Sequence, residues 1–390
     1  ALSQRLPEAD LRYLWGRVGY EAARQHHDDA LRWYARAADA RLDDEQLAWK
    51  VRAALRRGHW QTVRDTIDRM SPEVRRYSAW TYWYGRALAA HGEETGSRAY
   101  YLRIAGQADY YGLLADEELG YVGTLPESKY VPTEKEVAKA GRDPGLARAL
   151  ELIRLGMRTE GVKEWLFSIR RFDDVELLAA AELARRAEVY DRAIHTADRT
   201  VRTHNYSLRY PVPFQDVFTE YARDHGLDEA WVLGLARQES RFIADARSAA
   251  GAAGLMQLMP RTAKFVASKI GMRRFRHRDV TKVETNVNLG SRYMKLVLDQ
   301  LGHPVLASTA YNAGPSRARR WRGARPMEGA IYIENIPFLE TRDYVRKVMA
   351  NSVFYSAVLQ KQPTPLKARL GIIPARDGSE LIEEEGEELP

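Results

Sequence analysis

Glu239 is the residue in this sequence that is best placed for acid–base chemistry. It lies in the run DEAWVLGLARQESRF, at positions 228–242, where apolar residues recur at helical spacing. This spacing places Glu239 on the apolar face of the predicted helix, not on its solvent side. A carboxyl group beside apolar neighbours loses solvation, which raises its pKa towards neutrality. A proton donor for a glycosidic oxygen needs that property.

The helix that positions Glu239 is predicted to begin after Asp228, whose side chain can accept orphan N–H groups of the first turn. The solvent side is expected to carry Arg237 and Arg241. The predicted apolar face is made of Val232, Leu235, Ala236, Glu239 and Phe242. An isolated Glu at such a position is more often tied into a salt bridge near a helix end. The residues downstream therefore decide between the two interpretations.

A glycine-broken loop, SAAGAAGLMQLMPRTA, follows at positions 248–263. Gly251 and Gly254 allow positive φ angles and let a ligand approach the backbone closely. Pro260 is suited to open a new helix, which we expect to end at Gly271. The sequence therefore predicts a tight, ligand-accessible loop directly after the candidate acid.

Four motifs in this order resemble the soluble lytic transglycosylases of the bacterial periplasm. They are RQESRF around Glu239, GLMQLMP in the loop, AYNAGP at 310–315 and IPFLETRDYV at 336–345. The close match covers roughly residues 206–360, and the preceding helical part resembles the family's superhelical region only in character. The resemblance implies a lysozyme-like catalytic domain.

The resemblance also implies a substrate groove for a glycan. Glu239 would be the catalytic residue, and Gln257 would bind an N-acetyl or hydroxyl group. The residues that match groove positions are Ser248, Gln257, Met259, Tyr311, Asn312, Glu340 and Tyr344. From the residues alone, a buried tyrosine is the expected role of Tyr311, and a turn residue that of Asn312. A helix-capping role for Glu340 is as well supported as a contact with substrate. Ser316 is a candidate cap for the helix after Gly314.

Most glycosidases need two carboxylates, but no second acid stands at a motif position here. Asp245 is near Glu239 in sequence and matches no motif role. The resemblance implies a mechanism with one acid, which cleaves the MurNAc-β-1,4-GlcNAc bond without water and leaves a 1,6-anhydroMurNAc product. Three alternatives remain open at this stage: a hydrolase of the goose-lysozyme type, a chitin-active glycosidase, and a non-catalytic helical scaffold.

Composition fits a globular protein with an anionic partner. The chain has 390 residues, a net charge of +7 and no cysteine, which excludes disulfides, thiolate zinc sites and a cysteine nucleophile. No apolar run has the length of a membrane span or the layout of a signal peptide. Because the chain starts in helix-like sequence without an initiator Met, we interpret it as a mature or trimmed product of the periplasm, with the signal peptide removed.

The partners that we expect are peptidoglycan glycan strands and muropeptides. The arginine-rich run RARRWRGAR, at 317–325, favours a solvated helix face over a nucleic-acid site, which would need a stacking surface with phosphate contacts. The nine histidines show no metal-ligand spacing, and nucleotide-binding motifs are absent, so neither a metal nor a cofactor is predicted. We expect a monomer, and proteins of cell-wall synthesis are possible partners.

The fold class predicted from periodicity is mainly α, with at most a small β-element. Residues 1–125 resemble stacked αα-hairpins that form a superhelical region, in which Trp and Tyr form the core. A helical linker domain is expected at 126–205, after an irregular connector, and the lysozyme-like domain at 206–365. The acidic tail at 366–390 completes the predicted domains.

Overall fold

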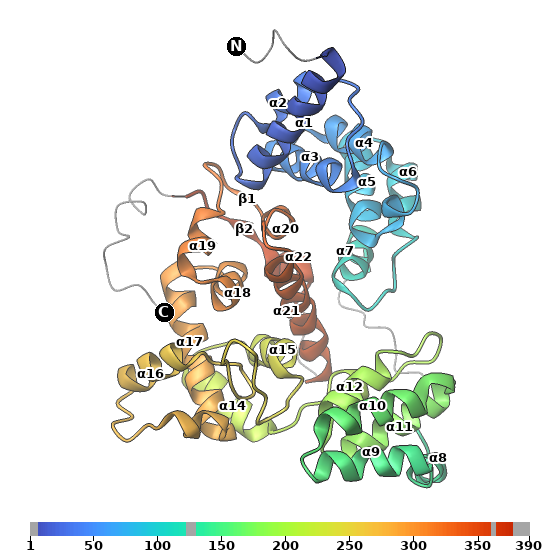
Figure 1. The fold of residues 1–390 in the computed structure, drawn as a ribbon, viewed down its shortest axis with the longest axis vertical. Helices are drawn as coiled ribbons and strands as arrows, with labels where there is room; N and C mark the ends of the chain where they lie inside the picture. The colour runs from blue at the N-terminus through green and yellow to red at the C-terminus, as the bar shows by residue number, and fades with distance from the viewer. Residues whose placement is uncertain (1–6, 122–129, 360–363, 377–390) are drawn as a thin grey trace. The chain divides into compact units, whose positions relative to one another are not determined.

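The computed structural model describes residues 7–121, 130–359 and 364–376, and these residues are mainly α-helical, as predicted (Figure 1). The connector around 122–129 and the acidic tail from 377 onward lie outside the described residues. The α-helices are α1 (Glu8–Arg24), α2 (Ala30–Arg36), α3 (Asp44–Arg57), α4 (Trp60–Asp68), α5 (Ser78–Ala90), α6 (Glu94–Tyr101), α7 (Tyr110–Glu118), α8 (Glu134–Gly141), α9 (Pro144–Arg154), α10 (Arg158–Ser168), α11 (Asp174–Arg186), α12 (Tyr190–Ala197), α13 (Tyr206–Arg209), α14 (Gln215–Asp224), α15 (Glu229–Ser240), α16 (Pro260–Lys269), α17 (Val283–Leu301), α18 (Pro304–Ala313), α19 (Pro315–Arg320), α20 (Gly329–Glu334), α21 (Leu339–Val358) and α22 (Leu366–Leu370).

Three short 3₁₀ helices and one small sheet complete the described elements. The 3₁₀ helices are η1 (Val74–Arg76), η2 (Ile169–Arg171) and η3 (His277–Thr281). Strands β1 (Met327–Glu328) and β2 (Ile372–Ile373) pair antiparallel, with Met327 opposite Ile373. This two-stranded sheet is the small β-element that the sequence allowed for.

The chain divides into two compact units, which we describe separately. The first unit comprises the described residues within 1–123, 296–350 and 364–389, and the second comprises those within 124–295 and 351–363. Helices α17 and α21 contribute residues to both units. The expected boundaries at 125/126, 205/206 and 365/366 stay predictions, because the units are defined by spatial contacts and reuse distant segments.

The first unit contains the predicted αα-hairpins. Helices α3 and α4 form one of them, and Gly58 turns the chain between them in the left-handed conformation, with a φ angle of 68°. Helices α1 and α2, and α5 and α6, pair in the same way. Several aromatic residues of these helices lie in the core, as the sequence predicted: Tyr34, Trp49, Tyr82 and Trp83 are each at most 1% exposed, although Tyr13 is 46% exposed.

A buried ionic network lies in the first unit. The Glu334 carboxylate accepts hydrogen bonds from Arg52 Nε at 3.0 Å, from the Tyr111 hydroxyl and from Arg346. Its side chain is 0% exposed. Burial alone would raise the pKa of Glu334, but the charges of Arg346, Arg52 and Arg342 outweigh it and lower the pKa to about 2. The network therefore ties α3, α7, α20 and α21 together through one ionised carboxylate.

The second unit combines the expected hairpins of the linker region with the helices around Glu239. Helices α9 and α10, and α11 and α12, pack in pairs around the buried Trp165, whose indole N–H donates to Thr196 at 2.9 Å. The end of α21 packs in the same unit, where Phe354 stacks on Tyr210 with ring centroids 4.6 Å apart. Hydrophobic burial therefore anchors the segments on both sides of α15.

Candidate functional site

Glu239 lies in the last turn of α15, in the second unit. The predicted cap is confirmed, because the Asp228 carboxylate accepts the Ala230 N–H at 3.0 Å. The three aliphatic residues of the predicted face, Val232, Leu235 and Ala236, are fully buried. Glu239 itself is half-buried. The helix therefore holds a carboxyl group at the edge of the core, where it is shielded on one side and accessible on the other.

The helix ends earlier than the sequence suggested. Arg241 and Phe242 both have positive φ angles, of 48° and 65°, so the prediction that Phe242 continues the helical face is wrong. The ring of Phe242 is nevertheless buried, with its centroid 6.1 Å from that of Phe218 and 6.4 Å from that of Tyr355. Burial of this ring offsets the strain of two left-handed residues. Strained backbone of this kind clusters at functional sites.

Arg237 also departs from expectation, because its side chain is only 11% exposed instead of facing solvent. Its guanidinium donates to the Arg209 carbonyl at 3.1 Å and to Asn351 Oδ1 at 3.3 Å, and it forms an ion pair with Asp198 at 3.2 Å. Asn351, from the end of α21, also donates to the Gly234 carbonyl at 3.1 Å. The Arg237 side chain makes these contacts only when it points into the protein, and the contacts fix the orientation of α15.

The loop after Glu239 has the backbone geometry that its glycines predicted. Gly251 and Gly254 have φ angles of 91° and 84°. A Cβ atom at Gly254 would lie 2.1 Å from Asn286 Nδ2, so a side chain has no room there. Gln257 has a φ angle of 45° although it is not glycine. The loop is therefore a tight structure with a defined conformation.

Asn286 of α17 supports this loop, a role that was not expected from the sequence. Its Oδ1 accepts the Met256 N–H at 2.7 Å, and its Nδ2 donates to the carbonyls of Ala253 at 3.1 Å and Val280 at 2.7 Å. Asn286 is 0% exposed. The signal that could have revealed it is a lone amide next to the buried face of a predicted helix, because buried amides need partners.

Three residues expected to contact substrate lie in this loop. Ser248 is exposed, and its Oγ accepts the Ala252 N–H at 3.0 Å. Gln257 is half-buried, and its Nε2 donates to the carbonyls of Ala246 at 3.1 Å and Gly254 at 2.8 Å. Met259 is 42% exposed. The first two thus help to shape the loop, whereas Met259 presents an apolar side chain at the surface.

Helix α16 begins as predicted at Pro260, which occupies its first helical position. It ends at Lys269, two residues before Gly271, whose φ angle is 76°. The left-handed glycine closes the turn after the helix, as glycine commonly does. The loop between α15 and α16 is therefore held at both ends by helix termini.

The remaining expected residues lie in the first unit. Tyr311 is half-buried and Asn312 is exposed, both in the last turn of α18. Gly314, with a φ angle of 90°, caps α19, so the expectation that Ser316 caps it is wrong. Since Pro315 already fills the first helical position, the cap must lie before it.

The AYNAGP and IPFLETRDYV motifs are brought together by a hydrogen bond from Thr341 Oγ1 to Asn312 Oδ1, at 2.7 Å. Glu340 is exposed in the first turn of α21, and Tyr344 is 5% exposed. An acid in the first turn is favoured by the helix dipole, in line with the capping alternative for Glu340. The first unit thus presents Asn312 and Glu340 at its surface from two adjoining helices.

The arginine-rich run is only partly solvated, contrary to expectation. Arg322 is 6% exposed and Trp321 is 7% exposed, whereas Arg317 and Arg325 are exposed. The indole of Trp321 packs edge-on against Phe338, with centroids 5.3 Å apart. Burial of the Trp321 indole leaves it little surface for stacking on a base.

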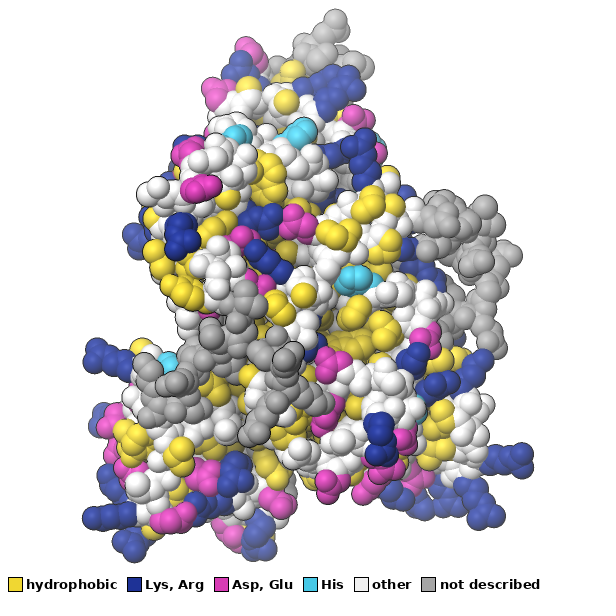
Figure 2. Space-filling view, turned by 180° about the vertical axis from the view of Figure 1, so that it is seen from behind, with side chains coloured by type: hydrophobic (Ala, Val, Ile, Leu, Met, Phe, Trp, Pro, Cys, Tyr) yellow, Lys and Arg dark blue, Asp and Glu magenta, His cyan; other side chains and the backbone are white. Residues whose placement is uncertain are grey.

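The surface carries mixed charge on the face shown in Figure 2, where basic and acidic side chains are interspersed. Among the described residues, no group of three or more His, Cys, Asp or Glu side chains is arranged to hold a metal ion. None of the described helices is both long and apolar enough to span a membrane.

Comparison with protein families gives three matches along the chain. The Transglycosylase SLT domain matches residues 216–333, which include Glu239 and its loop. The soluble lytic murein transglycosylase L domain matches 139–201, in the hairpins of the linker region. The soluble lytic transglycosylase helical domain matches 335–363, around α21.

Known proteins extend the similarity over most of the chain. The soluble lytic murein transglycosylase of Salmonella typhimurium is 29% identical over 310 residues, which are 78% of this chain and 48% of that protein. The Escherichia coli K12 protein of the same name is 26% identical over 94% of this chain and 58% of its own length. This chain therefore spans about half of the curated relatives that it matches.

Solved structures agree with this assignment. An inactive glutamate-to-glutamine mutant of the lytic transglycosylase Slt from Pseudomonas aeruginosa matches with a TM-score of 0.79 and 30% identity, over 93% of this chain and 59% of that one. The 70-kDa soluble lytic transglycosylase of Escherichia coli also gives 0.79, at 25% identity, over 97% of this chain and 61% of that one. Together with the three domain matches, these similarities establish that the chain belongs to the soluble lytic murein transglycosylase family.

Proposed function

We propose that this protein is a peptidoglycan lytic transglycosylase, a carbon–oxygen lyase that cleaves the bond between N-acetylmuramic acid and N-acetylglucosamine and forms a 1,6-anhydro product. The observation that carries the proposal is the position of Glu239, half-buried at the end of α15 within the matched SLT domain. An inactive mutant of the Pseudomonas relative has a glutamate replaced by glutamine, which supports a catalytic glutamate in this family.

In the proposed mechanism, Glu239 first donates its proton to the oxygen that links the two sugars. The bond from the muramyl anomeric carbon to that oxygen then breaks, and the neighbouring acetamido group stabilises the cationic carbon. The Glu239 carboxylate next takes the proton from the 6-hydroxyl of the same sugar, whose oxygen bonds to the anomeric carbon. Glu239 regains its proton, so one carboxyl group serves both steps. Attack within one molecule also avoids the entropy of capturing a second reactant.

The residues proposed to bind the saccharide or its peptide are those that the family resemblance implied. Met259 gives an apolar wall, and Gln257, whose Nε2 is engaged in the loop, has its Oε1 to accept an N–H group of an N-acetyl substituent. The exposed side chains of Asn312 and Glu340 offer an amide and a carboxylate. The full proposed set is Ser248, Gln257, Met259, Tyr311, Asn312, Glu340 and Tyr344.

The products of the reaction test this proposal. Purified protein is incubated with intact sacculi, and the released muropeptides are analysed by mass spectrometry. We expect anhydro-muropeptides, which lack one water relative to hydrolysis products. Reducing-end muropeptides would instead show a hydrolase, and turnover of chitin oligomers in preference to peptidoglycan would show a chitin-active enzyme.

We further propose that the protein acts as a monomer in the periplasm.

A further inference from the structure

A hollow of about 380 Å³ lies in the first unit, among the hairpin helices that carry none of the four motifs. We call it the arginine hollow. Its lining comes from the end of α4, from η1 and its flanking turns, from α5, and from the end of α6 with the turn after it. The lining residues with charged or aromatic side chains that matter here are Asp68, Arg75, Arg76, Tyr84, Tyr100 and Arg103.

Positive charge exceeds negative charge in this hollow. Asp68 is the acid of the lining, and it is already occupied, because it accepts the Tyr84 hydroxyl at 3.1 Å and lies 4.0 Å from Arg75. Within the described part of the chain, Arg76 and Arg103 form no ion pair with an acidic side chain. Guanidinium groups match the geometry of carboxylates, so an anionic ligand is the natural complement.

The other lining groups match a peptide better than a simple anion. The rings of Tyr84 and Tyr100 stack with centroids 4.5 Å apart, and Arg103 lies over the Tyr100 ring at 4.0 Å from its centroid. The Ser78 hydroxyl donates to Gln107 Oε1 at 3.1 Å, which orients the Gln107 NH₂ group as a donor for a carbonyl oxygen. The hollow therefore combines guanidinium groups that can bind carboxylates, an amide donor and an apolar aromatic wall.

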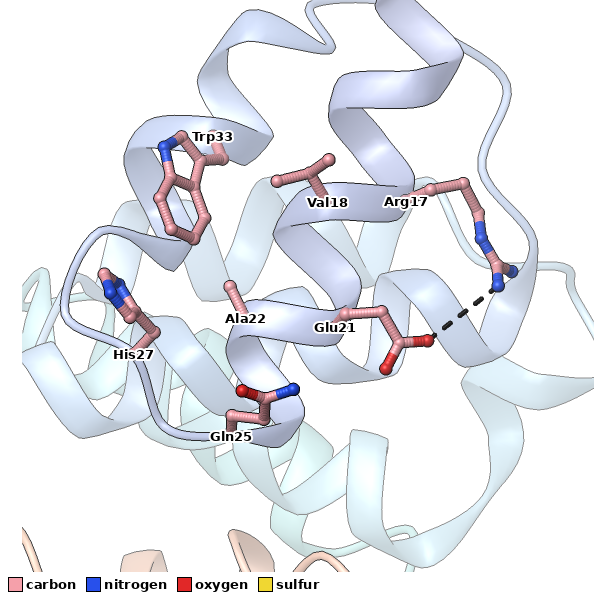
Figure 3. Close-up of a pocket in the computed structure, with 7 residues that line it drawn as sticks. All are labelled: Arg17, Val18, Glu21, Ala22, Gln25, His27 and Trp33. Carbon is pink, nitrogen blue, oxygen red and sulfur yellow. Dashed lines mark ion pairs between the residues drawn. The ribbon is translucent and has the colours of Figure 1, made fainter.

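A second hollow, of about 390 Å³ between α1 and α2, provides a contrast (Figure 3). We call it the Trp33 hollow. Its cation, Arg17, points toward Glu21 at 3.9 Å, so the pair is neutral, and Val18, Ala22 and Trp33 make much of its wall apolar. A hollow of similar size in the same unit thus lacks the excess charge of the arginine hollow. Volume alone does not select an anion.

We propose that the arginine hollow binds a short acidic peptide through its carboxylates, the chemistry of a peptidoglycan stem peptide. This inference rests on the proposed function for the identity of its ligand. It gives the chain a contact with substrate that is separate in sequence from the motifs around Glu239. Stem peptides project from the glycan at regular intervals, so a second contact would hold a strand while another part of it reacts.

The test measures binding without turnover. The Glu239→Gln variant of the 390-residue chain is titrated with the free tetrapeptide stem of peptidoglycan by isothermal calorimetry, at low and at physiological salt. We expect binding that weakens with salt and that Arg103→Ala weakens at least 10-fold, because a charge-assisted contact is lost. Arg76→Ala should weaken it less, by several-fold, and Arg17→Ala in the Trp33 hollow should leave it unchanged.

Controls separate this proposal from its alternatives. The melting temperature of each variant must match that of the parent, which the exposure of Arg76 and Arg103 favours. Peptide binding that is unaffected by Arg103→Ala, or no peptide binding at all, would overturn the proposal. The proposal would also be overturned if inorganic phosphate, or the same peptide with its carboxylates amidated, bound as tightly as the free peptide. The proposed function is judged from the products that the parent enzyme releases, and the peptide site is judged from binding. Failure of the proposed function can therefore be distinguished from failure of the proposed peptide site.

Discussion

Two glutamates, one in each unit, occupy opposite environments. Glu334 in the first unit is fully buried and surrounded by Arg52, Arg342 and Arg346, which hold its pKa at about 2. Glu239 in the second unit is half-buried at a helix end, next to the left-handed residues Arg241 and Phe242. The first carboxylate is kept ionised at neutral pH, whereas the second is accessible from one side.

This difference separates a structural carboxylate from the one that we propose to be catalytic. An acid that must give up and regain a proton cannot be enclosed by several cations, because they would hold it in the charged form. Glu334 therefore contributes to the fold of the first unit, and Glu239 is suited to chemistry. Variants at the two positions should accordingly fail in different assays, one in stability and the other in turnover.

The largest effect on stability is expected for Glu334→Gln. The change leaves three buried arginine charges without their shared anion. Breaking a buried ion pair from one side costs about 3–5 kcal/mol. Urea unfolding at pH 7, followed by circular dichroism, would measure it. Glu134→Gln is the matched control, because Glu134 pairs with Arg186 at the surface, with 81% of its side chain exposed. A Glu334→Gln protein as stable as this control would contradict the structural role.

A smaller loss, of about 2–3 kcal/mol, is expected for Asn286→Ala, because it leaves one buried N–H and two carbonyls beneath the loop without this partner. The same variant should also lower turnover, since the loop carries Ser248 and Gln257. Asn288→Ala, on the same helix but half-buried, should change both quantities much less. Equal effects of the two substitutions would contradict the role of the Asn286 amide in supporting the loop.

His26, which is half-buried in the first unit, extends the comparison to a titratable base. Burial and the charge of Arg56 lower its pKa to about 3. The folded state therefore disfavours the proton, so this contribution to stability is present above pH 6.5 and is lost as the pH falls towards 3. At pH 5 the loss should reach about 2 kcal/mol. For Glu334, whose pKa is also lowered, the loss comes only below about pH 4.5.

The measurement is urea unfolding of the parent and of His26→Gln between pH 7 and pH 5. Gln retains an N–H donor for the Asn335 carbonyl, which lies 2.7 Å from His26 Nε2. The difference in stability between the two proteins should shift in favour of the variant as the pH falls. A difference that is constant over this range would show that folding does not lower the pKa of His26.

The smallest effect is expected for Asp228→Ala, which removes the cap of α15. Loss of such a cap costs about 1 kcal/mol. Thermal unfolding would detect it as a shift of a few degrees. Asp245→Ala, an exposed residue in the following loop, is the control. A shift no larger than that of this control would mean that the cap contributes little.

Local signals in the sequence predicted much of this structure. Asp228, Gly254 and Pro260 each act through their own backbone geometry, so their roles could be inferred from residue type and neighbours. The helical hairpins followed from periodicity for the same reason. Four motifs in order carried the family assignment, which the domain matches then confirmed.

Features that depend on distant partners could not be predicted. Arg237 turns inward because Asp198 and Asn351 meet it there, and these residues are far away in sequence. The structural roles of Asn286 and Glu334 depend on contacts with residues that are distant in sequence. The end of α15 was misjudged because the burial of Phe242 favours a left-handed turn that propensity disfavours. Tertiary contacts decided each of these positions.

The most direct test of the central claim is the turnover of Glu239→Gln on purified peptidoglycan, measured beside its melting temperature. We predict that turnover falls by roughly 10²-fold or more, the scale of general acid catalysis, while the melting temperature stays within a few degrees of the parent. Asp245→Asn should retain turnover within a few-fold. If Glu239→Gln turned over peptidoglycan nearly as fast as the parent, Glu239 would not be the catalytic acid.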